Sequence, residues 1–136
     1  QAAVEAGRWA LDRALALRPA AGPYVLQAAI ASLQAEEDID WNEVSVLYEH
    51  LERLTGSPVV TLNRAVAVAE AGAPERALEL VDSLDLGEYR YLHSTRAELL
   101  RRLGRDDEAR EAFERALRLA ATDPERRFLA RRLSDL

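Results

Sequence analysis

The stretch Glu98-Leu-Leu-Arg-Arg-Leu-Gly-Arg-Asp-Asp-Glu-Ala-Arg-Glu-Ala-Phe-Glu-Arg-Ala-Leu-Arg-Leu119 decides the fold. Its apolar residues recur at helical spacing on both sides of Gly104, and glycine ends a helix at little cost because it readily adopts the left-handed backbone of a C-cap. The acidic run at 106–108 then suits the positive end of a second helix dipole. Ala97 and Ala109 are small enough to let two helices approach closely. The stretch therefore predicts an antiparallel helical hairpin.

A second, weaker copy of this pattern lies 32 residues earlier, which is the distance from Gly72 to Gly104. The same shift places Ala65 on Ala97. In this copy, at residues 58–84, Val81 stands at the position that Phe113 occupies in the first copy. The pattern resembles the tetratricopeptide repeat (TPR), in which a small residue, an aromatic residue and another small residue follow the inter-helix glycine at set intervals. It therefore predicts a fold of repeated helical hairpins.

The periodicity predicts about eight helices and no strand. They are expected at residues 2–17, 23–36, 41–54, 58–71, 74–84, 88–103, 106–120 and 124–134. We expect an all-α, TPR-like right-handed superhelix of antiparallel hairpins, forming a single domain over residues 1–136. The connection at 35–40 is longer than the repeat allows, and Asp40 is expected to cap the following helix in a capping box with Glu43.

The composition excludes several kinds of protein and site. The chain has no cysteine, which rules out disulfides, thiol nucleophiles and cysteine-ligated metals. No apolar run is long enough to span a membrane, and the first residues form an amphipathic pattern rather than a signal peptide, so we expect a cytoplasmic protein. Because the chain also lacks methionine, Gln1 is not a translational start, and we expect the chain to begin inside a longer protein or after a removed segment.

The charge pattern argues against direct binding to DNA. The formal net charge is −6, whereas a domain that binds nucleic acid alone usually carries a basic patch. Arginines gather between residues 96 and 132, but glutamates are interleaved with them at i,i+3 and i,i+4 offsets. Such spacing is typical of ion pairs on helix surfaces.

The residues that could carry chemistry form no catalytic pattern. His50 and His93 are too few for a metal cluster. Ser94 follows His93 on one helix and would point away from the imidazole, so Glu98 cannot complete a hydrolytic trio with them. No glycine-rich phosphate-binding loop is present. We expect no enzymatic activity, no cofactor and no metal.

What remains is surface for recognition. In stacked hairpins the first helices line a concave groove, and the candidate partner-binding residues on these helices are Tyr24, Gln27, Asn63, Arg64, Tyr91, His93 and Arg96. Asn63 and Arg64 interrupt a nearly apolar helix, so they either satisfy neighbouring polar groups or reach a partner. Tyr24 is also expected, with Trp41 and Tyr48, to pack the core of the first hairpin. The last helix, with Phe128, Leu129 and Leu133 on one side, is expected to cap the stack.

Three blocks carry a more specific resemblance. They read Gly-Pro-Tyr-Val-Leu-Gln-Ala-Ala-Ile-Ala at 22–31, Asp-Trp at 40–41 with Leu-Tyr at 47–48, and Ser-Pro-Val-Val-Thr-Leu-Asn-Arg-Ala-Val-Ala at 57–67. Together they resemble the C-terminal extension of a group of bacterial extracytoplasmic-function (ECF) sigma factors. In that group a TPR-like domain follows the two sigma domains that bind DNA and polymerase.

This resemblance implies a regulatory, protein-binding domain that modulates transcription initiation. Its partners would be its own sigma domains, RNA polymerase or a signalling protein. The sigma domains are absent from this sequence, so no promoter-binding residue can be assigned. The alternative is a free-standing TPR adaptor unrelated to transcription; a third interpretation, an enzyme accessory domain, has no sequence feature to support it.

Overall fold

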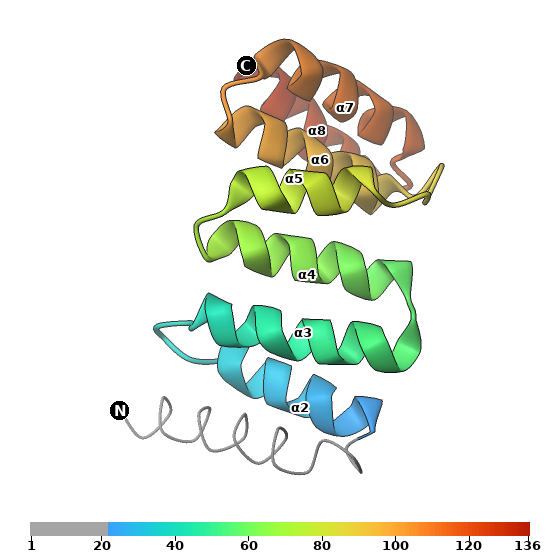
Figure 1. Ribbon diagram of the computed structural model, residues 1–136. Helices are drawn as coiled ribbons and strands as arrows, with labels where there is room; N and C mark the ends of the chain where they lie inside the picture. The colour runs from blue at the N-terminus through green and yellow to red at the C-terminus, as the bar shows by residue number, and fades with distance from the viewer. Residues whose placement is uncertain (1–21) are drawn as a thin grey trace. The chain divides into compact units, whose positions relative to one another are not determined.

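The computed structural model describes residues 22–136, which form seven α-helices and contain no strand (Figure 1). The helices are α2 (Pro23–Gln34), α3 (Trp41–Thr55), α4 (Pro58–Glu70), α5 (Pro74–Asp82), α6 (Arg90–Arg102), α7 (Asp106–Leu119) and α8 (Asp123–Ser134). The all-α prediction is confirmed for this part of the chain, and each helix ends within two residues of its predicted bounds. The helix predicted at 2–17 lies outside the described residues.

The chain divides into two compact units, Gln1–Gly72 and Ala73–Leu136. The boundary falls between α4 and α5, so the second repeat copy predicted at 58–84 extends across both units. Each of its two helices is present. The prediction of one domain over the whole chain stays a prediction, and the units are described one at a time.

In the first unit, α3 packs against both α2 and α4. The buried core is formed by Leu26, Ala29, Ile30, Leu33, Val44, Leu47, Leu51 and Ala67. Trp41 and Tyr48 pack against this core and are partly buried, as predicted. Burial raises the pKa of the Tyr48 hydroxyl above its usual value, although a hydrogen bond with Gln34 offsets part of that effect.

The prediction that Tyr24 packs in this core is wrong, because its side chain is 86% exposed. Leu26, two residues later, is buried. Two residues correspond to about 200° around a helix, so the two side chains face opposite directions. The helix turns the apolar stripe that begins at Leu26 toward α3, and this leaves Tyr24 in solvent.

The long connection before α3 ends in the predicted cap. The backbone N–H of Glu43 donates to the Oδ1 of Asp40 at 3.2 Å, which satisfies one of the donors that every helix leaves unpaired at its start. The α3 helix begins directly after Asp40 for this reason.

In the second unit, α6 packs against α5 and α7, and α8 packs against α7. Ala97 and Ala109, the small residues expected to allow close approach, are fully buried at 0% exposure, and Ala77 on α5 is buried to the same extent. Phe113 on α7 is likewise fully buried. The second unit is therefore built on alanines at the helix contacts and one aromatic ring in the core.

The turn between α6 and α7 depends on Gly104, whose φ is +75°. The N–H of Arg105 donates to the carbonyl of Leu100 at 2.9 Å, and the N–H of Gly104 donates to that of Arg101 at 3.0 Å. These two bonds form a Schellman motif, which pairs the carbonyls that the helix end leaves unsatisfied. The predicted role of this glycine is confirmed.

The Glu98 carboxylate of α6 pairs with an arginine of the last helix. Arg132 on α8 donates from Nε and Nη2 to the two oxygens of Glu98, at 2.8 and 2.7 Å, and Arg101 also contacts Glu98 at 3.1 Å. Leu129 is buried, but Phe128, expected on the same apolar side, is 54% exposed. One residue turns the helix by about 100°, so only Leu129 reaches the core.

Replacing Gly104 with alanine should lower the free energy of unfolding by about 1 to 2 kcal/mol, because L-residues disfavour the left-handed backbone. No atom lies within 4 Å of the added Cβ, so the cost arises from the backbone and not from a clash. Urea denaturation of wild type and Gly104→Ala measures it. Gly104→Asn should lose less stability, since asparagine tolerates this conformation. Equal stability of wild type and Gly104→Ala would contradict the role assigned to Gly104 in the turn.

The Glu98 pairs should make stability depend on pH. Burial alone would raise the pKa of the Glu98 carboxyl, but the hydrogen bonds and charges of Arg132 and Arg101 outweigh burial and hold the pKa below its usual value. The stabilisation is therefore fully present above the unfolded-state pKa of about 4.3, and it is lost as pH falls through the lower folded-state pKa.

Thermal unfolding of Glu98→Gln against wild type measures this effect. The variant should be about 1 kcal/mol less stable at pH 7, and the difference should shrink near pH 3. The matched control is Glu79→Gln, which removes an exposed carboxylate from α5. A Glu98→Gln deficit that stays constant with pH would show that the paired charge does not stabilise α8.

Candidate interaction surface

Three of the predicted partner-binding residues are exposed in the first unit. Tyr24 and Gln27 lie three residues apart on α2, an offset that places them on the same face of the helix. Asn63 lies on α4, and its side chain is also exposed. These residues are accessible to a partner, on two helices that both pack against α3.

Arg64, the neighbour of Asn63, is engaged within the chain. Its Nη1 donates to both carboxylate oxygens of Glu52 on α3, at 2.9 and 3.0 Å, and its side chain is only 13% exposed. The pair joins α3 to α4. Of the two alternatives for this position, the geometry supports the structural one for Arg64, while the exposed Asn63 is accessible to a partner.

In the second unit, α6 directs its three predicted residues into two different hollows. Tyr91 lines a hollow of about 130 Å³ that α6 forms with α7 and α8. His93 and Arg96 line another of about 420 Å³, whose further residues, all on α7, are Glu111, Ala112, Glu114, Arg115 and Arg118. The three residues therefore do not share one site.

The smaller hollow is mainly apolar. Ala116 and Leu129 are buried, and Tyr91 and Phe128 stand at 49% and 54% exposure around them. The other lining residues are Arg90, Ser94 and Glu125. Phe128 was not among the predicted binding residues, because the last helix, with Phe128, Leu129 and Leu133 on one side, was expected only to cap the stack.

Tyr91 is held in place by its neighbours. The guanidinium of Arg90 lies 4.8 Å from the centre of the Tyr91 ring, and the ring of Tyr89 meets it edge-on with a centroid distance of 5.5 Å. A hydrogen bond to the Tyr91 hydroxyl, together with the charge of Glu125 3.2 Å away, raises the pKa of Arg90 above its usual value. The tyrosine is therefore oriented before any partner arrives.

His93 and Arg96 position the connection before α6. The Nε2 of His93 lies 2.6 Å from the carbonyl oxygen of Gly87; a carbonyl only accepts, so this nitrogen carries the proton. The Nε of Arg96 donates to the Oδ1 of Asp82, the last residue of α5, at 2.8 Å. Both side chains thus bind this chain itself, and neither bond could be assigned from sequence spacing.

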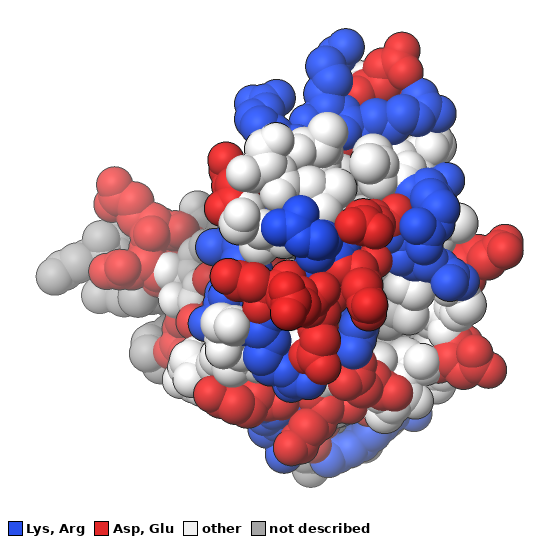
Figure 2. Space-filling view, turned by 90° about the horizontal axis from the view of Figure 1, so that it is seen from above, with Lys and Arg blue, Asp and Glu red and all other residues white. Residues whose placement is uncertain are grey.

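The surface charges are mixed in sign. Arg101 pairs with Glu98, Arg105 with Glu108 and Arg126 with Asp123, each three residues apart on or beside one helix. The predicted ion pairs at helical spacing are confirmed. Figure 2 shows blue and red side chains interspersed across the visible face.

Within residues 22–136, no group of three His, Cys, Asp or Glu side chains is arranged to hold a metal ion. Over the same residues, no helix combines the length and the apolar character needed to cross a membrane. His93 and Ser94 each bond a backbone carbonyl, of Gly87 and Tyr91 respectively, and not one another.

Comparison with known proteins identifies the α6–α7 hairpin. Residues 90–123 match the sequence profile of the tetratricopeptide repeat family. A protein of Rhizobium meliloti (strain 1021), itself uncharacterized, is 50% identical over 121 residues, which cover 85% of this chain and 29% of that protein. The chain thus spans less than a third of this relative. No solved structure matches at a significant level. The chain contains a tetratricopeptide repeat within an all-helical repeat fold, and such a repeat suggests binding to other proteins.

Proposed function

We propose that this chain is a protein-interaction module that regulates an ECF sigma factor. The observation that carries the proposal is the hollow lined by Tyr91 and Phe128, because two half-exposed aromatic rings stand there around a buried apolar floor. Aromatic residues are enriched at the centres of protein interfaces, and tyrosine is among the residues that most often contribute a large share of the binding energy.

The hollow suits an apolar side chain presented by a partner protein. Its size, about 130 Å³, fits one aliphatic or aromatic group. Tyr91 is already oriented by Arg90 and Tyr89, so binding immobilises little that was mobile before, and this reduces the entropic cost of association. The paired Arg90 and Glu125 form a polar rim.

The link to transcription rests on the resemblance of the three sequence blocks at 22–31, 40–48 and 57–67. The relative's greater length is compatible with it, since two thirds of that protein leave room for further domains. In this proposal the module docks on the sigma domains, RNA polymerase or a signalling protein in the cytoplasm. It would shift the population of an active arrangement. The formal charge of −6 fits a protein partner better than direct contact with DNA.

A double variant tests the docking hollow. In the native protein that contains this chain, Tyr91→Ala with Phe128→Ala should weaken binding to RNA polymerase or to the sigma domains at least tenfold, because both rings are truncated at the proposed contact. Surface plasmon resonance with each purified component measures the affinity. Val46→Ala, which truncates an exposed apolar residue of α3, is the matched control and should leave the affinity unchanged.

Deletion tests the transcriptional role. Removing residues 22–136 from the native protein should change promoter-specific transcription in a reconstituted assay, because the regulatory contacts are lost while the rest of the protein remains. Unchanged transcription across inducing conditions would contradict the sigma-factor proposal. If the double variant nevertheless lost a protein partner found by affinity capture from the source cells, the free-standing adaptor would be favoured instead.

A further inference from the structure

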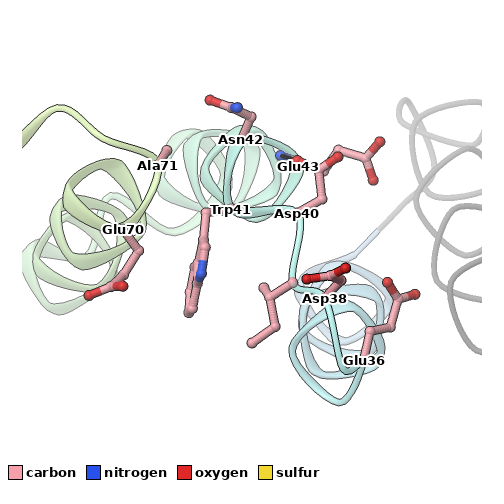
Figure 3. Close-up of a pocket in the computed structure, with 9 residues that line it drawn as sticks. Glu36, Asp38, Asp40, Trp41, Asn42, Glu43, Glu70 and Ala71 are labelled. Atoms are coloured by element: carbon pink, nitrogen blue, oxygen red, sulfur yellow. Dashed lines mark hydrogen bonds between the residues drawn. The ribbon is translucent and has the colours of Figure 1, made fainter.

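The first unit contains an acidic pocket that none of the predicted partner-binding residues lines. Its volume is about 510 Å³, and it lies where the connection after α2 meets the start of α3 and the end of α4 (Figure 3). The lining residues are Glu36, Asp38, Ile39, Asp40, Trp41, Asn42, Glu43, Glu70 and Ala71. Five of these nine are acidic and none is basic. In the view of Figure 3, the Trp41 ring lies between Glu70 on one side and Asp38 and Glu36 on the other.

The fold itself accounts for two of these carboxylates. Asp40 caps α3 by accepting the backbone N–H of Glu43, and Glu43 lies in the first turn of that helix. Negative charge is favourable there because the N-terminal end of a helix carries partial positive charge.

Two further carboxylates stand where a helix dipole disfavours them. Glu36 and Asp38 follow the C-terminal end of α2. This helix has no basic residue in its last turn. The C-terminal end of a helix carries partial negative charge, so each such carboxylate costs a few tenths to about 1 kcal/mol. A positive charge in the pocket would remove this cost.

Glu36 gives a second, independent indication. Its side chain is only 6% exposed, and its Oε1 is enclosed without a hydrogen-bond partner among residues 22–136. An unpaired buried polar atom costs about 1 to 3 kcal/mol, and more when it is charged. The neighbouring Asp38 is also acidic and cannot donate a bond while ionised. The pocket therefore lacks a cationic donor at Glu36.

We propose that this pocket binds the guanidinium group of an arginine on a basic segment of a partner protein. A guanidinium offers several N–H donors to carboxylates in a fixed planar fork, and it stacks on indole rings. Glu36, Asp38 and Trp41 provide these two kinds of contact in one pocket. A metal ion is a poorer fit, because no three acidic or histidine side chains within residues 22–136 converge as ligands would.

The inference goes beyond the proposed function, since it concerns a different site in the other unit and names the chemistry of the bound group. The pocket volume accommodates a guanidinium together with part of its methylene stem. Its charge complements a basic segment, so binding should weaken as salt screens the carboxylates.

The experiment titrates the ¹⁵N-labelled 136-residue chain with the peptide N-acetyl-Gly-Arg-Gly-amide. The readout is the indole N–H signal of Trp41, assigned with Trp41→Phe. The arginine peptide should shift this signal in a saturable and salt-sensitive manner, whereas the uncharged citrulline peptide should not. Glu36→Gln should weaken the affinity about tenfold, because it removes the negative charge of the carboxylate that accepts the hydrogen bond from the guanidinium.

Glu37→Gln is the matched control, because it makes the same change at the next residue, which is exposed and does not line the pocket. It should bind like wild type. Asp38→Asn should also weaken binding. Because Asp38 is exposed, this substitution should not disturb folding, so it tests the proposal even if Glu36→Gln fails to fold. Equal weakening by Glu36→Gln and Glu37→Gln, or equal binding of both peptides, would overturn the proposal.

Two further arms separate the alternatives. A Glu36-dependent shift on addition of Ca²⁺ or Mg²⁺ alone, with no response to the arginine peptide, would make this a metal site and overturn the proposal. The variant Tyr91→Ala with Phe128→Ala should bind the arginine peptide normally. Failure of the acidic pocket is thus distinguishable from failure of the proposed docking hollow.

Discussion

Close approach of neighbouring helices is the constraint on which the rest of the structure depends. The described helices are 9 to 15 residues long, and isolated helices of this length are marginal in water, so tertiary packing must stabilise them. In the second unit that packing is made by alanines with no exposed surface at 77, 97, 109 and 116. A larger side chain at these positions would force the helices apart and expose the core around Phe113. The glycine-ended turn at Gly104 then lets the chain reverse direction between α6 and α7 within a few residues.

This dependence explains how much could be predicted from the sequence. Helix bounds, the Asp40 cap, the Gly104 turn and the buried alanines all follow from local spacing and backbone preference, and all were predictable. The exposure of Tyr24 and Phe128 was not. Each ring lies one or two residues from a buried leucine. Whether the ring or the leucine is buried depends on which face of the helix packs against its neighbour.

The candidate sites were less predictable for the same reason. Arg64 was selected as a polar residue in an apolar helix, but its partner Glu52 lies twelve residues away on another helix. Arg96 likewise pairs with Asp82 across the connection from α5 to α6. Such pairs are set by tertiary packing and leave no periodic signal. Tyr91 was predicted from its place on the first helix of a hairpin. Phe128 on α8 could be recognised only from the structure, which shows that it lines the same hollow.

The charged residues at helix ends help to distinguish those that stabilise the fold from those that are available to bind a partner. The α6, α7 and α8 helices have arginines in their last turns, as their dipoles favour. Asp82 breaks this rule at the end of α5, but Arg96 compensates for it. Glu36 and Asp38 break it after α2, and within residues 22–136 no basic residue of the last turn of α2 compensates for them. Broken local rules of this kind are expected at functional sites, and in the proposal above the missing positive charge comes from the bound arginine.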